Sequence, residues 1–308
     1  MLAPAQGSPC RYRSGFLEGT YYEILEPLDA TDRAPVLMIA GGAHSAACYL
    51  ATADERPGWA HDFVAAGYPV VLVDWPGVGR SGTITPAEYH GSQRMVDGIA
   101  QILCSLDQPA TVMTHSISGA FGWKLIEQHG DHIARLIGVA PASPGNMGKH
   151  LGELVWEDGP IRVVSMPSGE VEIDLRKPLD LDAGFARRKL VGSSSRFPAD
   201  AFGAYFATLL AVPGRITYER TNIGDAQLRI EGFTAFMNKP VLIVTPTNDI
   251  DHPRALDGEI VTWLTQAGAH AEQLYLGDIN ITGNGHMAML ETNSDAIARA
   301  MIAWIERS

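Results

Sequence analysis

The 308-residue sequence predicts an α/β protein built on a mostly parallel, doubly wound sheet. Short, continuous apolar runs, typical of strands that are buried on both faces, alternate along the chain with segments of helical pattern. Such alternation implies right-handed crossovers, which place helices on both sides of one sheet. The composition is that of a folded globular protein, because 46% of the residues are hydrophobic and 19% are charged.

The predicted elements follow one another in a regular order. An antiparallel edge strand over residues 19–26 precedes the first buried strand. Buried strands are predicted at residues 35–40, 68–73, 110–116, 136–140, 240–245 and 271–276. Helices are predicted at residues 59–66, 92–106, from 120 to near 129, 256–267 and 294–307.

One interval, residues 141–238, interrupts this order. Residues 162–174 resemble a hairpin with a Gly-containing turn. A later apolar stripe at helical spacing consists of Phe202, Tyr205, Phe206, Leu209 and Leu210. This stripe either packs on the domain or belongs to a cap whose aromatic face lines a pocket. Long insertions in compact folds are usually functional, so we favour the cap. The predicted domains are a core of residues 1–140 and 239–308, and a cap of residues 141–238.

Charge and cysteine content restrict the class of protein. The formal charge of −12 argues against a nucleic-acid or anionic-membrane surface. No run approaches the roughly 18 apolar residues of a membrane span, and residues 1–10 show no signal-peptide pattern. The cysteines, Cys10, Cys48 and Cys104, lack metal-ligand spacing and are expected to be free thiols. We therefore expect a cytoplasmic protein without a metal.

The most informative motif is Thr114–Gly119, with the sequence THSISG. It joins an apolar run to a helical pattern, so Ser116 stands at the apex of a strand–turn–helix corner. This arrangement is typical of a nucleophile elbow, which exposes a hydroxyl for covalent catalysis. The usual motif has Gly two residues on either side of the Ser, whereas this chain has Thr114 and Ser118. An ordinary strand–helix corner is the alternative.

A glycine-rich loop follows the first buried strand. Gly41 and Gly42 would let backbone amides approach a ligand, and an oxyanion hole needs such an amide beside the one that follows the nucleophile. The predicted pair is Gly42 and Ile117, and a plain Gly turn is the alternative. A second Gly-containing loop, residues 74–81, lacks both the P-loop Lys and the dinucleotide spacing. We interpret it as a turn at the rim of a pocket.

Candidates for an acid and a base come later in the chain. Asp249 and Asp251 follow the strand at 240–245, and Asp249 is favoured because it lies closer to the strand end; a solvated acidic turn is the alternative. His286 stands on a Gly-flanked loop before the last helix. The chain order Ser, acid, His is that of the α/β hydrolases.

At this point the chain resembles the α/β-hydrolase superfamily over nearly its whole length. Residues 74–81 look like the superfamily's loop after its fourth strand, and residues 56–59 and 283–287 look like a bacterial carboxylesterase subgroup. The resemblance implies an α/β-hydrolase fold with a mostly parallel central sheet flanked by helices, and a cap between core strands 6 and 7. It also implies a cofactor-free serine hydrolase of esters or lactones with Ser116 as nucleophile and His286 as base.

The chain departs from that subgroup in one respect that concerns the acid. Relatives often carry Glu-Pro after the sixth strand, but residues 139–142 read VAPA, so Asp249 must supply the carboxylate. The substrate is expected to be small and apolar or aromatic. The predicted binding residues are Ala43, His44, His115, Tyr205, Phe206 and Met287.

Two other functions stay open on these residues. The first is a lyase on the same scaffold, of the hydroxynitrile-lyase type, in which the triad acts as a base without an acyl-enzyme. The second is a small-molecule sensor with a vestigial triad, which the irregular motif around Ser116 keeps open. The expected partner is a small molecule, not a nucleic acid or a membrane, and a homodimer is left open.

Overall fold

The structure is a computed structural model that describes residues 7–308 except residues 30, 83–90 and 168. In the described chain a large sheet has the strand order β1-β2-β4-β3-β5-β6-β10-β11. All neighbours from β4 to β11 pair in parallel, whereas β2 is antiparallel to β1 and to β4. The strand bounds are β1 Cys10–Leu17, β2 Thr20–Pro27, β3 Val36–Ile39, β4 Val70–Val73, β5 Ala110–His115, β6 Ile133–Val139, β10 Pro240–Thr245 and β11 His270–Tyr275. The predicted fold class is confirmed.

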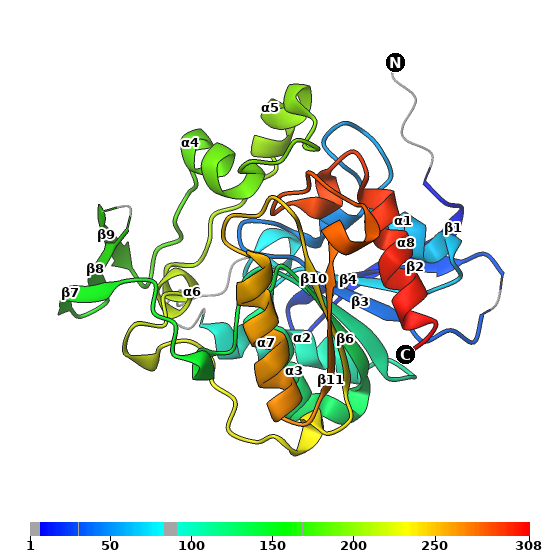
Figure 1. The fold of residues 1–308 in the computed structure, drawn as a ribbon, viewed down its shortest axis with the longest axis horizontal. Coiled ribbons are helices and arrows are strands. Elements are labelled where there is room, and N and C mark those ends of the chain that lie inside the picture. The colour runs from blue at the N-terminus through cyan, green and yellow to red at the C-terminus, as the bar shows by residue number, and fades with distance from the viewer. Residues whose placement is uncertain (1–6, 30, 83–90, 168) are drawn as a thin grey trace.

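Helices cover both faces of this sheet (Figure 1). One face carries α1 (Trp59–Ala65) and α8 (Ser294–Ile305). The other carries α2 (Ser92–Cys104), α3 (Ser118–His129) and α7 (Arg254–Gln266).

Strand β3 shows why these strands read as continuous apolar runs. Val36 and Met38 pack in the hydrophobic cluster that includes α1 and α8. The alternate residues Leu37 and Ile39 pack in the cluster that includes α2, α3 and α7. Because successive side chains point to opposite faces, a strand covered on both sides needs an apolar residue at every position.

The edge of the sheet differs from the prediction. Residues 19–26 were expected to form the edge strand, but β2 lies between β1 and β4, and β1 is the edge. Most side chains of β1 are exposed, and Arg13 pairs with Glu26 across the hairpin. An edge strand that is charged and open to water carries no apolar run, so the sequence pattern gave no signal for it.

The insertion between β6 and β10 contains a second, smaller sheet. Strands β7 (Glu153–Asp158), β8 (Ile161–Met166) and β9 (Gly169–Asp174) form an antiparallel sheet in the order β7-β8-β9, which extends to one side in Figure 1. The predicted hairpin corresponds to β8 and β9, although its turn includes Ser168, which lies outside the described residues. Strand β7 was not predicted, because it is exposed along its whole length.

Short helices make up the rest of the insertion. They include α4 (Ala183–Phe185), η6 (Ala186–Val191), α5 (Phe202–Phe206) and α6 (Gly214–Glu219), together with the single turns η5 (Gly145–Met147), η7 (Ala199–Ala201), η8 (Ile223–Asp225) and η9 (Thr234–Phe236). The predicted apolar stripe is only partly helical, because α5 ends at Phe206 and the chain turns before Leu209 and Leu210.

Two further predictions concern the chain as a whole. In the part that the structure describes, no helix combines the length and the apolar character needed to cross a membrane. Cys10, Cys48 and Cys104 are all free thiols, as expected.

Candidate active site

Ser116 lies at a sharp corner between β5 and α3. Its φ of 54° is in the left-handed region, which non-glycine residues seldom adopt. Its backbone is fixed on both sides: the Ser116 amide donates to Val139 O (3.1 Å), and Ser116 O accepts from the amides of Gly119 (2.9 Å) and Ala142 (2.8 Å). These hydrogen bonds hold a strained residue at the end of the strand, which is the geometry that nucleophile elbows use.

The two residues that replace the usual glycines are accommodated in different ways. Thr114 is fully buried and faces Gly122 of α3, where an added Cβ would lie 2.8 Å from Thr114 Cγ2. The Ser118 hydroxyl accepts from the His115 amide (2.9 Å) and lies 3.1 Å from its acceptor Ile39 O. A glycine on the helix thus makes room for the β-branched residue on the strand, and the serine takes part in the corner's own hydrogen bonding.

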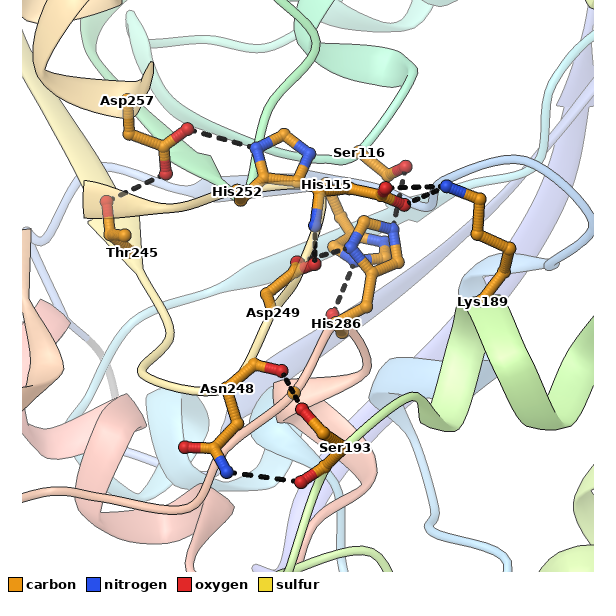
Figure 2. Close-up of polar contacts among 12 residues, drawn as sticks. His115, Ser116, Lys189, Ser193, Thr245, Asn248, Asp249, His252, Asp257 and His286 are labelled. Atoms are coloured by element: carbon orange, nitrogen blue, oxygen red, sulfur yellow. Dashed lines mark hydrogen bonds and ion pairs between the residues drawn. The ribbon is translucent and has the colours of Figure 1, made fainter. Parts of the chain in front are cut away.

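His286 and Asp249 come together with Ser116 (Figure 2). His286 Nδ1 is 2.7 Å from Asp249 Oδ2, and His286 Nε2 is 2.9 Å from Ser116 Oγ. A carboxylate only accepts, so Nδ1 carries the proton, and Nε2 is then free to accept from the Ser116 hydroxyl. The three predicted residues form one continuous hydrogen-bonded chain.

Asp249 is held in its ionised form. Burial opposes ionisation, but the hydrogen bond to His286, the charges of His286 and His252, and the Asp251 amide outweigh it and lower the pKa of Asp249 to about 2. The Asp251 amide donates to Asp249 Oδ1 at 3.0 Å. Both carboxylate oxygens therefore have partners, as a buried charge requires.

Asp251, the alternative acid, has another partner. Its carboxylate oxygens both lie 2.5 Å from Lys189 Nζ of η6 in the insertion. Figure 2 shows Lys189 reaching toward the loop that carries Asp249. Asp251 therefore ties the insertion to this loop, and Asp249 is the carboxylate that bonds to His286.

The loop that carries His286 is anchored from beneath by residues that the sequence analysis did not single out. Glu291 is buried and accepts from the Gly285 amide (2.7 Å) and from Asn284 Nδ2 (2.5 Å). Asn284 O in turn accepts from the Asn248 amide (2.8 Å), next to Asp249. These contacts couple the base loop to the acid loop. Nothing in the sequence around Glu291 distinguishes it from a surface carboxylate at the start of a helix.

Gly42 and Ile117, the predicted oxyanion pair, are neighbours in space. A Cβ added at Gly42 would lie 3.4 Å from Ile117 Cγ2. Within the described chain, neither backbone amide donates to a protein acceptor. Two adjacent amides are thus available beside Ser116.

His44 joins this loop to the insertion. Its Nδ1 lies 2.8 Å from Gly42 O, and its Nε2 lies 3.0 Å from the Tyr205 hydroxyl. Burial lowers the pKa of His44 to about 4, so the ring is neutral near pH 7. Because a carbonyl only accepts, Nδ1 donates to Gly42 and Nε2 accepts from Tyr205. The amide of Leu210 adds a second link by donating to Ala43 O at 2.9 Å.

The other predicted binding residues are placed differently. Phe206 of α5 is half-buried and stacks on Phe202, with ring centroids 6.1 Å apart. His115 is fully buried beneath His286, and its Nε2 donates to His286 O at 3.0 Å. Met287 is fully buried in the hydrophobic core. His115 and Met287 therefore offer no surface to a substrate in this structure. The prediction was wrong for these two residues because the sequence cannot show which neighbours of a site residue face the core.

The Gly-containing loop at residues 74–81 folds around its own carboxylate. Asp74 is buried and accepts from the amides of Ala46 (2.7 Å) and Arg80 (2.9 Å) and from the Arg80 side chain (2.8 Å). Amides that bind an internal carboxylate are not available to a phosphate. The loop packs against the segment that follows Gly42 and so supports the candidate site.

A further histidine, His252, was not identified from the sequence as a site residue. Its ring stacks on His286, and Asp249, His252 and His286 place ligand-type atoms within 4.8 Å of one another. The Asp249–His286 hydrogen bond and the ring stacking account for this spacing.

Comparisons with known proteins identify the family and the fold. The model of the "Alpha/beta hydrolase family" matches residues 36–300. The chain is 24% identical to "Probable secreted lipase phiG" of Fungal sp. (strain ATCC 74256), over 93% of this chain and 85% of that protein.

Two solved structures are similar at lower identity. The methylesterase MES16 from Arabidopsis has a TM-score of 0.61 at 15% identity, covering 90% of this chain and all (100%) of that one. An esterase from Exiguobacterium antarcticum has a TM-score of 0.60 at 15% identity, covering 93% and 95%. At these identities the structures show a shared fold, whereas the family model spans most of the sequence. The chain belongs to the alpha/beta hydrolase family.

Proposed function

We propose that this protein is a serine hydrolase that cleaves a carboxylic ester or lactone through an acyl-enzyme. The observation that carries the proposal is the hydrogen-bonded chain from Ser116 Oγ through His286 to Asp249, with Ser116 held at a φ of 54°. This chain places a hydroxyl beside a base that a buried carboxylate orients. The similar lipase and esterases support ester chemistry.

The proposed reaction has two steps. His286 Nε2 takes the proton of Ser116 Oγ as the oxygen attacks the substrate carbonyl, and the tetrahedral intermediate expels the alcohol, which receives that proton. Water, activated by His286, then hydrolyses the acyl-enzyme. In both steps the amides of Gly42 and Ile117 donate to the oxyanion, and Asp249 stabilises the imidazolium without taking its proton.

We propose a small, apolar or aromatic substrate and assign no cofactor. Residues 141–238 act as the cap. Of the other binding candidates, Phe206 is half-buried, whereas Ala43, His44 and Tyr205 are buried where the cap meets the loop of Gly42. His44 and Tyr205 link the cap to the loop of Gly42 through their hydrogen bond at 3.0 Å. A cytoplasmic location remains a prediction from the sequence, which leaves a homodimer open.

Labelling with a fluorophosphonate, followed by intact mass and peptide mapping, tests the proposal. We expect a single adduct on Ser116 and none in Ser116→Ala, while Ser165→Ala, a change at an exposed serine of β8, labels normally. Turnover of a chromogenic ester with a trapped acyl-enzyme is expected next, and it distinguishes a hydrolase from a lyase. A folded sample that binds ligands but gives neither adduct nor turnover would instead indicate a sensor.

A further inference from the structure

His252 occupies a place beside the proposed base that the ester-hydrolysis mechanism does not use. The ring centroids of His252 and His286 are 5.6 Å apart, and the ring planes differ by 22°. The His252 side chain is only 12% exposed. A second imidazole is thus stacked on the residue that is proposed to move the proton.

A chain of buried hydrogen bonds fixes this second ring. His252 Nδ1 lies 3.0 Å from Asp257 Oδ1, and the other Asp257 oxygen accepts from Thr245 Oγ1 at 2.8 Å. Gln273 Nε2 donates to the same Thr245 oxygen at 3.1 Å. Because the Asp257 carboxylate only accepts, His252 Nδ1 carries a proton, and Figure 2 shows the pair lying next to Asp249 and His286. The arrangement repeats the His–Asp pair of the candidate site one ring away.

The charges around His252 favour its protonated form. Burial disfavours the imidazolium, but the hydrogen bond to Asp257 and the charges of Asp257, Asp249 and Asp251 outweigh burial and raise the pKa of His252. These carboxylates come from α7 and from the loop after β10.

The remaining titratable neighbours lie on other elements. His286 and, beneath it, the neutral His115 come from the base loop and from β5. Lys189 of η6 pairs with Asp251, which weakens the influence of that carboxylate. His252 is therefore a titratable ring, with its charged form favoured by its neighbours, within stacking distance of His286.

We propose that His252 is a positioning residue for the proposed ester hydrolysis. Held by Asp257, its ring fixes the plane of His286, and its positive charge opposes a second positive charge on His286. A charge on His252 thus disfavours the imidazolium form of His286 and favours the form that acts as a base. The inference rests on the proposed function, because it concerns the residue assigned there as the base.

The pH profile of kcat/KM tests this role with two complementary variants. His252→Asn keeps a donor toward Asp257 but removes the ring and its charge, and Asp257→Asn keeps the ring but removes the carboxylate that supports the charge. We expect the acid limb to move to higher pH by about one unit in His252→Asn, since a unit charge at this distance acts through a partly screened interior. Asp257→Asn should move it in the same direction but by less, because this change also removes a negative charge. His270→Asn, at an exposed position of β11, serves as the matched control with an unchanged limb.

Either of two results would overturn the proposal. One is an acid limb in His252→Asn and Asp257→Asn that coincides with the wild-type limb. The other is lower activity at every pH with the same limb, which is what a purely structural role predicts.

A titration of the labelled imidazoles by NMR gives a readout that needs no turnover. The His252 signal is expected to titrate at higher pH in the wild-type protein than in Asp257→Asn, because Asp257 supports the charged ring. If the protein hydrolyses no ester, the proposed function fails, and this arrangement still stands or falls on its own; a His252 titration that is the same in both proteins contradicts the charge on which the positioning role depends.

Discussion

Gly122 of α3 faces Thr114 of β5, and the missing side chain of the glycine leaves the space that the threonine methyl group fills. An added Cβ at Gly122 would lie 2.8 Å from Thr114 Cγ2 and 2.9 Å from Leu136 Cδ1. The departure from the usual elbow sequence is therefore matched by a glycine about one turn into the helix. The corner keeps its shape because the Thr114 side chain of β5 fills the space that a side chain at position 122 of α3 would occupy.

Gly122→Ala should destabilise the fold. The overpacked contact costs about 1–3 kcal/mol, which exceeds the gain in helix propensity of about 1 kcal/mol. Gly258→Ala is the matched control, since an added Cβ there meets only Gln273 Oε1 at 3.5 Å. Denaturant unfolding measures both variants. If Gly122→Ala proved as stable as Gly258→Ala, the steric account would be wrong.

Thr114→Val should leave stability unchanged or raise it by about 1 kcal/mol. The Thr114 hydroxyl is buried and finds no hydrogen-bond partner among the described residues. Replacing an unpaired buried hydroxyl with a methyl group of similar size removes a desolvation penalty. The free energy of unfolding is the measurement, and a loss of more than about 1 kcal/mol would show that the hydroxyl is bonded after all.

Asp249→Asn should lower kcat by roughly four orders of magnitude, because the amide favours the wrong tautomer of His286. Asp251→Asn should cost less than about tenfold, since it breaks only a half-exposed ion pair with Lys189. Steady-state kinetics on one chromogenic ester compares the variants. Equal losses in the two would contradict the assignment of Asp249 as the acid.

The free energy of unfolding should fall at acid pH, in part because Asp249 becomes protonated. Its folded-state pKa is about 2, below the unfolded value near 3.9, so its contribution is present above pH 4 and is lost as pH falls toward 2. The contribution is about 2 kcal/mol. Unfolding measured between pH 2 and 6 should show a shallower acid slope in Asp249→Asn. Parallel curves of unfolding free energy against pH for the two proteins would mean that the neighbours of Asp249 do not lower its pKa.

Tyr205→Phe should destabilise the protein by about 1–3 kcal/mol, because it leaves the buried Nε2 of His44 without a donor. Tyr218→Phe is the control, because its hydroxyl makes no hydrogen bond within the described residues, and it should change stability by less than about 0.5 kcal/mol. Thermal or denaturant unfolding distinguishes them. An identical effect in both variants would show that the His44–Tyr205 contact contributes nothing.

Local sequence pattern predicts the structure best where it coincides with tertiary burial. The strands and helices of the large sheet were predicted to within a few residues, because a strand covered on both faces must be apolar throughout. It failed where elements are exposed: β1 and β7 carry polar or mixed side chains and leave no such signal. Helix α5 is shorter than its apolar stripe because the chain turns to bring Leu210 to Ala43.

The sequence by itself determined the fold class and predicted the candidate site residues Ser116, Asp249 and His286, since each follows a recognisable strand end. Only the tertiary structure decided how the neighbours of these residues are used. In the folded protein Asp249 hydrogen-bonds to His286, whereas Asp251 pairs with Lys189. His115 is buried beneath the site, and His252 stacks on His286. The physical reason is that strand ends are marked by local composition, whereas partners contributed by distant loops depend on how those loops pack together.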